Sequence, residues 1–241
     1  MNEGIPGAPE PAAPDHLATY QKIREMILFG DLAPGQPVTI HGMTAATSAG
    51  MTPVREAIRR LTAEGALEAL ENRRVCVPLM TAAAFDEILY ARQAIEPRLA
   101  GLAASRIDAH GVERLEQLDA EVDEAIARGD ARSYLRHNYL FHFAIYEAAR
   151  TEVLVRIVGS LWLRMGPALR VVCGRYGTSN LPDRHKDAVA ALRAGDADAA
   201  TTALQRDIGE GAGLVREALT ADGGGDEAPA PAAARLTASE I

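Results

Sequence analysis

The chain has 241 residues, of which 48% are hydrophobic, 24% are charged and only 5% are aromatic, a composition that indicates a folded, mainly helical protein and excludes disorder for the body of the chain. No run of about 18 apolar residues is present to span a membrane, and the start of the chain lacks the basic and apolar segments of a signal peptide, so we expect a cytoplasmic protein with no membrane partner. Cys76 and Cys173 lie far apart and form no Cys-x-x-Cys pair, which excludes a disulfide framework and a thiolate zinc site.

The net charge of −8 is unevenly distributed along the chain. Residues 15–80 carry seven Lys and Arg against seven Asp and Glu and are neutral overall, whereas residues 81–241 carry 18 against 24, a balance of −6. Five arginines of the first segment cluster at positions 55–60 and 73–74. Because proteins bind nucleic acid through local basic surfaces, an acidic chain of this kind can still carry a DNA-binding face.

The N-terminal segment predicts three helices. Apolar residues recur at helical spacing over Leu17–Ile27, and Phe29-Gly30 ends this first helix. Thr39 is placed to cap a short second helix that runs to about Thr47. Thr52 followed by Pro53 predicts the N-cap and first position of a third helix that ends at Gly65.

After the third helix, apolar residues on both sides of a polar turn at 71–74 predict a two-stranded ribbon. No strand signal follows position 81, and helices are predicted over about 82–106, 111–128, 130–149, 151–172, 182–194 and 196–219. The predicted fold class is therefore mainly α, with an N-terminal winged helix-turn-helix at 14–79 and a C-terminal all-helical bundle at 80–220. Residues 1–13 and 221–241 are rich in Gly, Pro and Ala and are predicted to be disordered tails.

The break Ser48–Gly50 between the second and third helices is the arrangement that places the later helix in the DNA major groove. Arg55 is then the expected base reader, because its guanidinium can donate two hydrogen bonds to guanine O6 and N7. Thr52 is placed to contact phosphate or base and Arg59 to contact phosphate, while Arg73 and Arg74 at the ribbon tip suit the minor groove or the backbone. The charges alone fit a solvated helix face equally well; the order of the elements favours DNA binding.

Residues 17–80 resemble the DNA-binding domain of the GntR family, in Ile23–Ile27, Gly30–Gly35 and above all Thr52–Leu61. The helices that follow the ribbon point to the FadR-type subfamily, in which an FCD domain binds an effector and dimerises. The resemblance implies a ligand-responsive transcriptional regulator, by default a repressor, that binds a palindromic double-stranded operator as a homodimer and is not an enzyme. Two positions depart from the family: Met51 follows Gly50 where Ser-Arg is usual, so Met51 takes a base-reading position and changes operator preference, and Arg74 replaces the wing glycine.

Four residues of the second domain form a candidate metal site. Asn138 and His142 are four positions apart on one predicted helix, about 40° apart around its axis, and His185 and Asp207 lie in later helices. Each residue alone is more typical of an ordinary core or surface polar group, but the set resembles the FCD metal site, with Asn138 where Asp is usual and Asp207 where His is usual. This mixed nitrogen and oxygen set implies a divalent ion such as Zn²⁺, Ni²⁺, Mn²⁺ or Fe²⁺.

Arg92 and Glu96 resemble the Arg and Glu on the first helix of FCD domains. They are either a surface ion pair or an effector site in which Arg92 clamps the carboxylate of a small organic acid beside the metal. Trp162 is either core or part of the pocket wall. Two other classes stay open: a helical metalloenzyme, disfavoured because the motifs offer no separate general base or nucleophile, and a binding module whose metal is purely structural. The sequence does not define the effector, the operator or the target genes.

Overall fold

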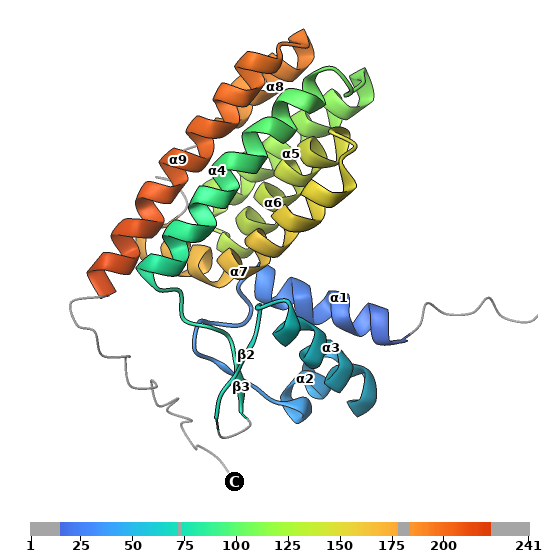
Figure 1. Cartoon of the computed structure of the whole chain (residues 1–241), viewed down its shortest axis with the longest axis vertical. Helices are drawn as coiled ribbons and strands as arrows, with labels where there is room; N and C mark the ends of the chain where they lie inside the picture. Colours follow the sequence, from blue (N-terminus) through green and yellow to red (C-terminus); the bar gives the residue numbers. More distant parts are fainter. Residues whose placement is uncertain (1–14, 72–73, 178–183, 223–241) are drawn as a thin grey trace, which may run out of the picture.

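The computed structural model describes residues 15–71, 74–177 and 184–222. Within these ranges the chain forms a small winged helix-turn-helix below a larger bundle of helices (Figure 1). This arrangement confirms the predicted fold class.

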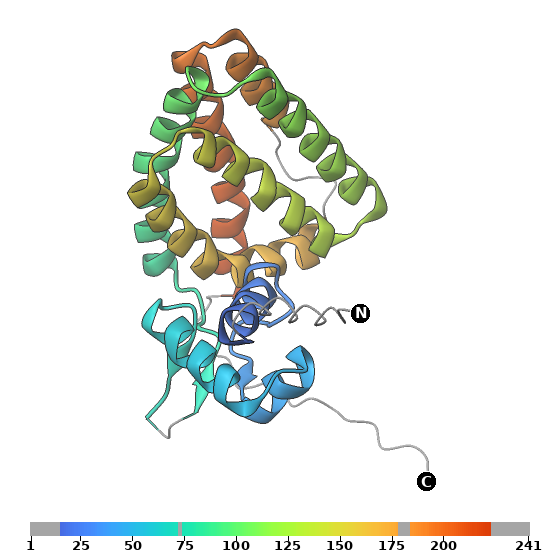
Figure 2. The same cartoon turned by 90° about the vertical axis from the view of Figure 1, so that its right-hand side faces the viewer.

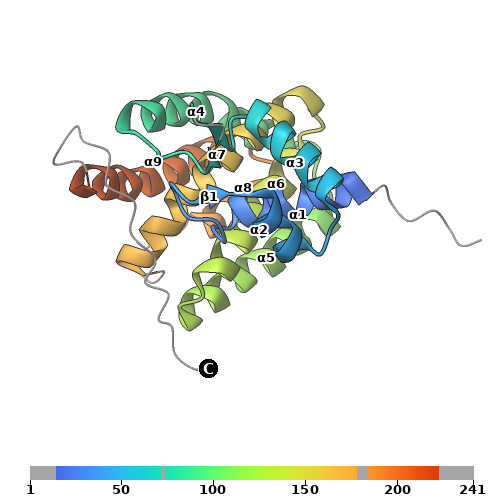
Figure 3. The ribbon, with the colours of Figure 1, turned by 90° about the horizontal axis from the view of Figure 1, so that it is seen from below.

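The lower domain consists of α1 (Asp15–Leu28), β1 (Pro37–Val38), α2 (Ile40–Thr47), α3 (Met51–Ala63), β2 (Glu68–Ala69) and β3 (Val75–Cys76). Its strands form an antiparallel sheet in the order β1-β3-β2. The predicted two-stranded ribbon is therefore incomplete, because β1 adds a third strand through the pairing of Val38 with Val75. In the view from below, α2 and α3 lie towards the viewer, so this helix pair forms part of the outer end of the molecule (Figures 1 and 3).

Local caps set the ends of the helix pair. The Thr39 hydroxyl accepts a hydrogen bond from the Gly42 N–H, as predicted, and α2 ends where Ser48 takes a left-handed φ of 58°. The prediction that Thr52 caps α3 is wrong, because the first helical hydrogen bond runs from the Val54 N–H to the Gly50 carbonyl and makes Gly50 the N-cap. Pro53 then lies in the first turn, where the N–H that proline lacks has no helical partner. The predicted end at Gly65 is two residues too late, since α3 stops at Ala63.

The upper domain consists of α4 (Ala82–Ala104), α5 (Ala109–Arg128), α6 (Ala131–Ala148), α7 (Glu152–Tyr176), α8 (His185–Ala194) and α9 (Ala197–Asp222). These helices lie close to the predicted ranges, and α9 continues two residues into the range predicted as a tail. Residues 1–13, 182–183 and 223–241 lie outside the described part of the chain, so the predictions for them are not tested. Helices α4 and α9 run side by side (Figure 1). They approach so closely that a Cβ at Gly101 would lie 2.6 Å from the Thr201 hydroxyl oxygen and 3.3 Å from the Ala197 carbonyl oxygen, so a larger residue there would require the Thr201 side chain to move.

The two domains meet where α1 lies directly below α7 (Figure 2). A Cβ at Gly166 of α7 would lie 2.4 Å from the carbonyl oxygen of Leu28, so only glycine permits this contact. At the side of the interface, the Arg132 guanidinium donates two hydrogen bonds to the Asp31 carboxylate, at 2.7 and 3.0 Å. The lower domain thus packs against α7 and is joined to α6 by the Arg132–Asp31 pair.

No helix in the described ranges is both long enough and apolar enough to cross a membrane.

Candidate functional site

One face of α3 carries the predicted DNA contacts. Met51, Thr52, Arg55 and Arg59 are all exposed, while the opposite face, which includes Val54 and Leu61, is buried in the domain core. The helix is therefore held by its apolar side, and its polar side is available to a partner.

The arginines of this domain differ in their surroundings. Arg55 is exposed, whereas the Arg59 guanidinium is paired with Glu56, with Nη2–Oε1 at 2.5 Å and Nε–Oε2 at 3.0 Å. Arg60 lies over the ring of Tyr20 of α1, with its Cζ 3.8 Å from the ring centroid, and so belongs to the domain packing. The Arg59 side chain is thus exposed but held by an ion pair on its own helix.

The wing is described only in part. Arg74, immediately before β3, is exposed, and Arg73 lies outside the described residues. Of the two arginines predicted to contact DNA from the wing tip, only Arg74 is placed by the structure.

Three of the four predicted metal ligands lie together inside the bundle. His142 of α6, His185 of α8 and Asp207 of α9 each offer one ligand atom, and these atoms all lie within 4.8 Å of one another. Both imidazoles are buried. Asn138 is half-buried and lies one turn before His142 on the same helix.

The tautomer of His142 follows from its neighbours. The buried Tyr146 hydroxyl donates to Glu96 Oε2 at 2.6 Å, and burial, together with the charge of Glu96, raises the pKa of Tyr146 well above its ordinary value. The tyrosine therefore stays protonated, and its O–H donates the hydrogen bond to Glu96. Its oxygen then accepts a hydrogen bond from the N–H at His142 Nδ1, at 3.0 Å. The other nitrogen, Nε2, lies 3.3 Å from Asp207 Oδ2.

Asp207 supplies negative charge to this cluster. Burial is the largest influence and raises the pKa of Asp207. The hydrogen bond and charge of His142, the charge of His185 and the Arg184 backbone hydrogen bond together outweigh it, so the net shift of the pKa is downward. Its Oδ1 also accepts the backbone N–H of Arg184 at 3.2 Å. A carboxylate and the lone pair of a neutral imidazole repel each other at this distance, so a positive charge, either a proton on Nε2 or a metal ion, must stabilise the pair.

His185 contacts a residue that the sequence analysis missed. Its Nδ1 lies 3.2 Å from Oδ1 of Asp119 on α5, a buried carboxylate, and its ring stacks on Phe141 with centroids 3.8 Å apart. The available signal was a carboxylate on the apolar face of α5, among the buried Leu115, Leu118 and Val122. Such a carboxylate orients a histidine so that its other nitrogen can bind a metal.

The pair Arg92–Glu96 is buried, and so the alternative of a surface ion pair is wrong. Arg92 Nε donates to Glu96 Oε1 at 2.7 Å and Nη2 donates to Oε2 at 3.1 Å. The guanidinium carbon lies 4.5 Å from the ring centroid of Trp162, and that ring lies 5.0 Å from the ring of His142. Tyr146 and Trp162 thus connect the predicted effector residues to the predicted metal ligands.

Two family models match the chain. The model described as "Bacterial regulatory proteins, gntR family" matches residues 16–77, and the model described as "FCD domain" matches residues 87–210, more than half of the chain. The chain belongs to the GntR family. The resemblance on which the sequence analysis relied is confirmed, and the GntR regulator described above combines a DNA-binding winged helix-turn-helix with an FCD effector domain.

Curated relatives of this GntR regulator are transcription factors. The HTH-type transcriptional regulator McbR of Escherichia coli K12 is 27% identical over 183 residues, which cover 75% of this chain and 83% of McbR. The probable D-xylose utilization operon transcriptional repressor of Paenarthrobacter nicotinovorans is 28% identical over 191 residues, 78% of this chain and 84% of that repressor. Families and relatives alike are regulators, which excludes the metalloenzyme alternative.

Solved structures share the fold of this GntR regulator. The structure of E. coli McbR/YncC superposes with a TM-score of 0.80 at 24% identity and covers 86% of this chain and 99% of that one. A putative GntR regulator from Rhodococcus sp. RHA1 superposes with a TM-score of 0.68 at 22% identity and covers 83% of this chain and 96% of that one. Both matches extend over the two domains.

The Tyr146 hydroxyl is expected to stabilise the fold of this GntR regulator. Tyr146→Phe leaves the buried Glu96 and His142 each without one hydrogen-bond partner, and should lower the free energy of unfolding by about 1–3 kcal/mol. Urea denaturation followed by circular dichroism measures the loss. The matched control is Tyr90→Phe, since Tyr90 is 78% exposed and its change should stay within about 0.5 kcal/mol. Equal effects of the two substitutions would show that the hydrogen bonds of the Tyr146 hydroxyl do not stabilise the fold.

Proposed function

We propose that this GntR regulator is a homodimeric repressor that binds a palindromic operator and is controlled by a divalent metal ion and a small organic acid in its FCD domain. The observation that carries the proposal is the buried His142–Asp207 contact, in which an imidazole nitrogen and a carboxylate oxygen lie 3.3 Å apart beside His185.

For DNA binding, we place α3 in the major groove with Arg55 as the reader of a guanine. Thr52 and Arg59 contact phosphate or base edges near it, and the wing arginines Arg73 and Arg74 contact the backbone or the minor groove. Met51 takes the position where relatives offer a guanidinium, so its apolar side chain alters the base preference. Two copies related by a two-fold axis would place their α3 helices on half-sites about one helical turn apart.

For the metal, His142, His185 and Asp207 fit the donor set of a divalent ion, with Asn138 as the fourth candidate ligand. Because Nδ1 of His142 donates to Tyr146, its Nε2 is the nitrogen that can bind the ion. The Asp119 carboxylate orients the ring of His185. Two imidazoles with oxygen ligands suit Zn²⁺, Ni²⁺, Mn²⁺ or Fe²⁺. Once bound, the ion would supply a positive charge that holds an oxygen of the effector.

For the effector, we assign Arg92, Glu96 and Trp162, which lie beside the proposed metal ligands. Arg92 Nη1 has a thioether as neighbour, Met165 Sδ at 3.3 Å, which is a weak acceptor for a charged donor. The buried indole N–H of Trp162 has no hydrogen-bond partner within the described residues. Two buried donors with poor or absent acceptors favour a ligand that brings carboxylate oxygens.

Metal analysis tests this proposal. The full-length protein is stripped with chelator, dialysed against Zn²⁺, Ni²⁺ or Mn²⁺ and analysed by plasma mass spectrometry, and one of these ions should be retained at about one equivalent per chain. Operator affinity is then measured for the stripped and the loaded protein. A lower melting temperature on stripping, with operator and effector responses unchanged, would mean that the ion is structural only. Failure to retain any of the three ions would overturn the metal site and reassign the side chains to direct binding of the effector.

A further inference from the structure

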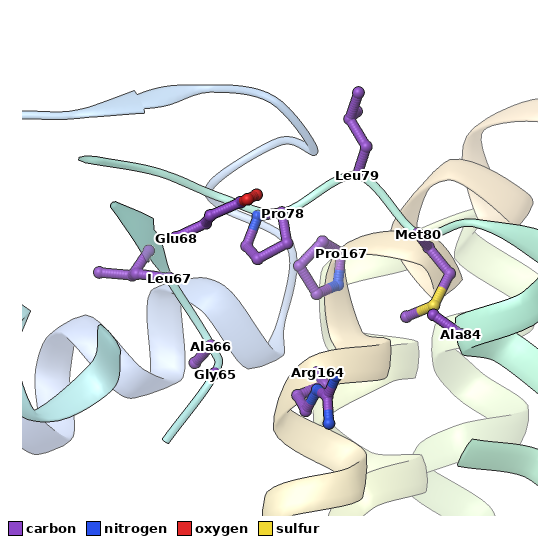
Figure 4. A pocket seen from close by; sticks show the side chains of 10 residues that line it. All are labelled: Gly65, Ala66, Leu67, Glu68, Pro78, Leu79, Met80, Ala84, Arg164 and Pro167. Atoms are coloured by element: carbon purple, nitrogen blue, oxygen red, sulfur yellow. The ribbon is translucent and has the colours of Figure 1, made fainter. Parts of the chain in front are cut away.

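A separate cavity lies at the junction of the two domains. Its volume is about 290 Å³. Its walls come from residues 65–68 at the start of the wing, residues 78–80 of the interdomain linker, Ala84 of α4, and Arg164 and Pro167 of α7 (Figure 4). None of the proposed metal or effector residues lines this cavity. Its size is at the lower end of the roughly 300–1,000 Å³ typical of small-molecule pockets.

The cavity wall is mostly apolar. Leu79 and Met80 of the linker, Ala84 of α4 and Pro167 of α7 all contribute to it (Figure 4). Leu79 is 47% exposed, so about half of its apolar surface is open to water. Filling this space with an apolar group would remove that surface from water.

One cation, Arg164 of α7, completes the wall. Within the ranges that the structure describes, Arg164 has no carboxylate partner. Gly65, with φ +72°, faces it without a side chain: a Cβ at Gly65 would lie 3.6 Å from Arg164 Nε and 3.9 Å from its Cζ. Left-handed φ favours glycine at this position, and the Arg164 side chain is exposed, so its guanidinium is accessible to a ligand in the cavity.

The charges define the ligand class. An arginine in an apolar wall is complementary to a carboxylate attached to an apolar body. Glu68, on the wall that belongs to the DNA-binding domain, disfavours a second negative charge. We propose that this interdomain cavity binds a small organic monocarboxylate, with its carboxylate on Arg164 and its apolar body against Leu79, Met80 and Pro167.

The position of the site gives the ligand a defined effect. Because its walls come from both domains, the ligand binds best when both walls are in place, and it stabilises this domain arrangement over any other. This site acts independently of the metal centre and is a second input to the regulator.

Methyl resonances of methionine can test the proposal on the full-length protein. Met80 lines the cavity, whereas Met165 lies beside Arg92 in the proposed effector site. The protein is labelled at its methionine methyl groups, Met80→Leu and Met165→Leu assign the two signals, and hexanoate and benzoate are titrated with the corresponding amides as neutral controls. We expect a saturable shift of the Met80 signal with at least one carboxylate and weaker binding of its amide.

Two variants and two matched controls identify the site. Arg164→Gln should weaken binding about tenfold, because a charge-assisted hydrogen bond is lost, and Ala84→Leu should abolish it by filling the cavity. Arg156→Gln removes an exposed arginine of α7 that pairs with Glu152, and Ala83→Leu adds the same bulk on the exposed side of α4; both should bind as the parent does. Melting temperatures verify that each variant folds.

Three results would overturn the proposal. These are no Met80 shift with either carboxylate, equal binding of carboxylate and amide, or a shift of Met165 that survives Ala84→Leu. None of the substituted positions contacts the metal ligands, so metal retention in the same samples reports separately on the proposed function.

Discussion

Replacing Arg55 by alanine is expected to weaken operator binding by about 1–3 kcal/mol and to remove discrimination at one base pair per half-site. Arg55 is exposed on α3, one turn after the helix begins at Met51, where a recognition helix reaches base edges. Fluorescence anisotropy with the operator, with single-base variants of it and with random DNA measures both effects.

A phosphate contact would behave differently. Arg74→Gly in the wing should weaken operator and random DNA alike and reduce the salt slope of binding by about one unit. Arg128→Ala, at the exposed end of α5 where it pairs with Glu124, serves as the control and should leave DNA binding unchanged. If Arg55→Ala lowers operator and random DNA affinity equally, Arg55 is a phosphate contact and the base-reading assignment fails.

Replacing either imidazole of the buried cluster by alanine is expected to abolish metal retention. With His142→Ala or His185→Ala, the ion keeps one nitrogen ligand and the oxygen ligands, too few for tight binding of a transition metal. Plasma mass spectrometry after dialysis against the ion that the parent retains measures the loss. His110→Ala is the matched control, since the side chain of His110 is 90% exposed on α5.

A substitution at Asn138 is expected to strengthen metal binding rather than abolish it. Asn138→Asp places a carboxylate one turn before His142 and should retain the ion and tighten its binding, because a negative charge replaces a neutral amide beside a cation. Competition with a chelator of known affinity gives the change in binding constant. An unchanged binding constant in Asn138→Asp would show that Asn138 is not a ligand.

Local signals in the sequence were sufficient to predict the helices. The Thr39 cap of α2 and the apolar face of α3 depend on residues a few positions apart, and the structure confirms both. The preference for threonine at the N-cap and proline after it predicts the wrong start for α3. Thr52-Pro53 fits an N-cap pair, yet the turn after Ser48 begins the helix at Met51 and leaves Pro53 inside the first turn.

By itself, the sequence determined the family, the order of the helices and the residues for two candidate sites, because each of these is encoded in short motifs or in the periodicity of one element. Only the tertiary structure decided what depends on residues distant in the chain. Strand β1 is two residues long and is defined by its pairing with Val75, not by any pattern of its own. Asp119 contacts His185 because α5 packs against α8, and Arg92 is buried with Glu96 because Trp162 of α7 covers the guanidinium. Burial and polar contacts of this kind arise from the neighbours that the fold supplies, and spacing along one helix cannot specify them.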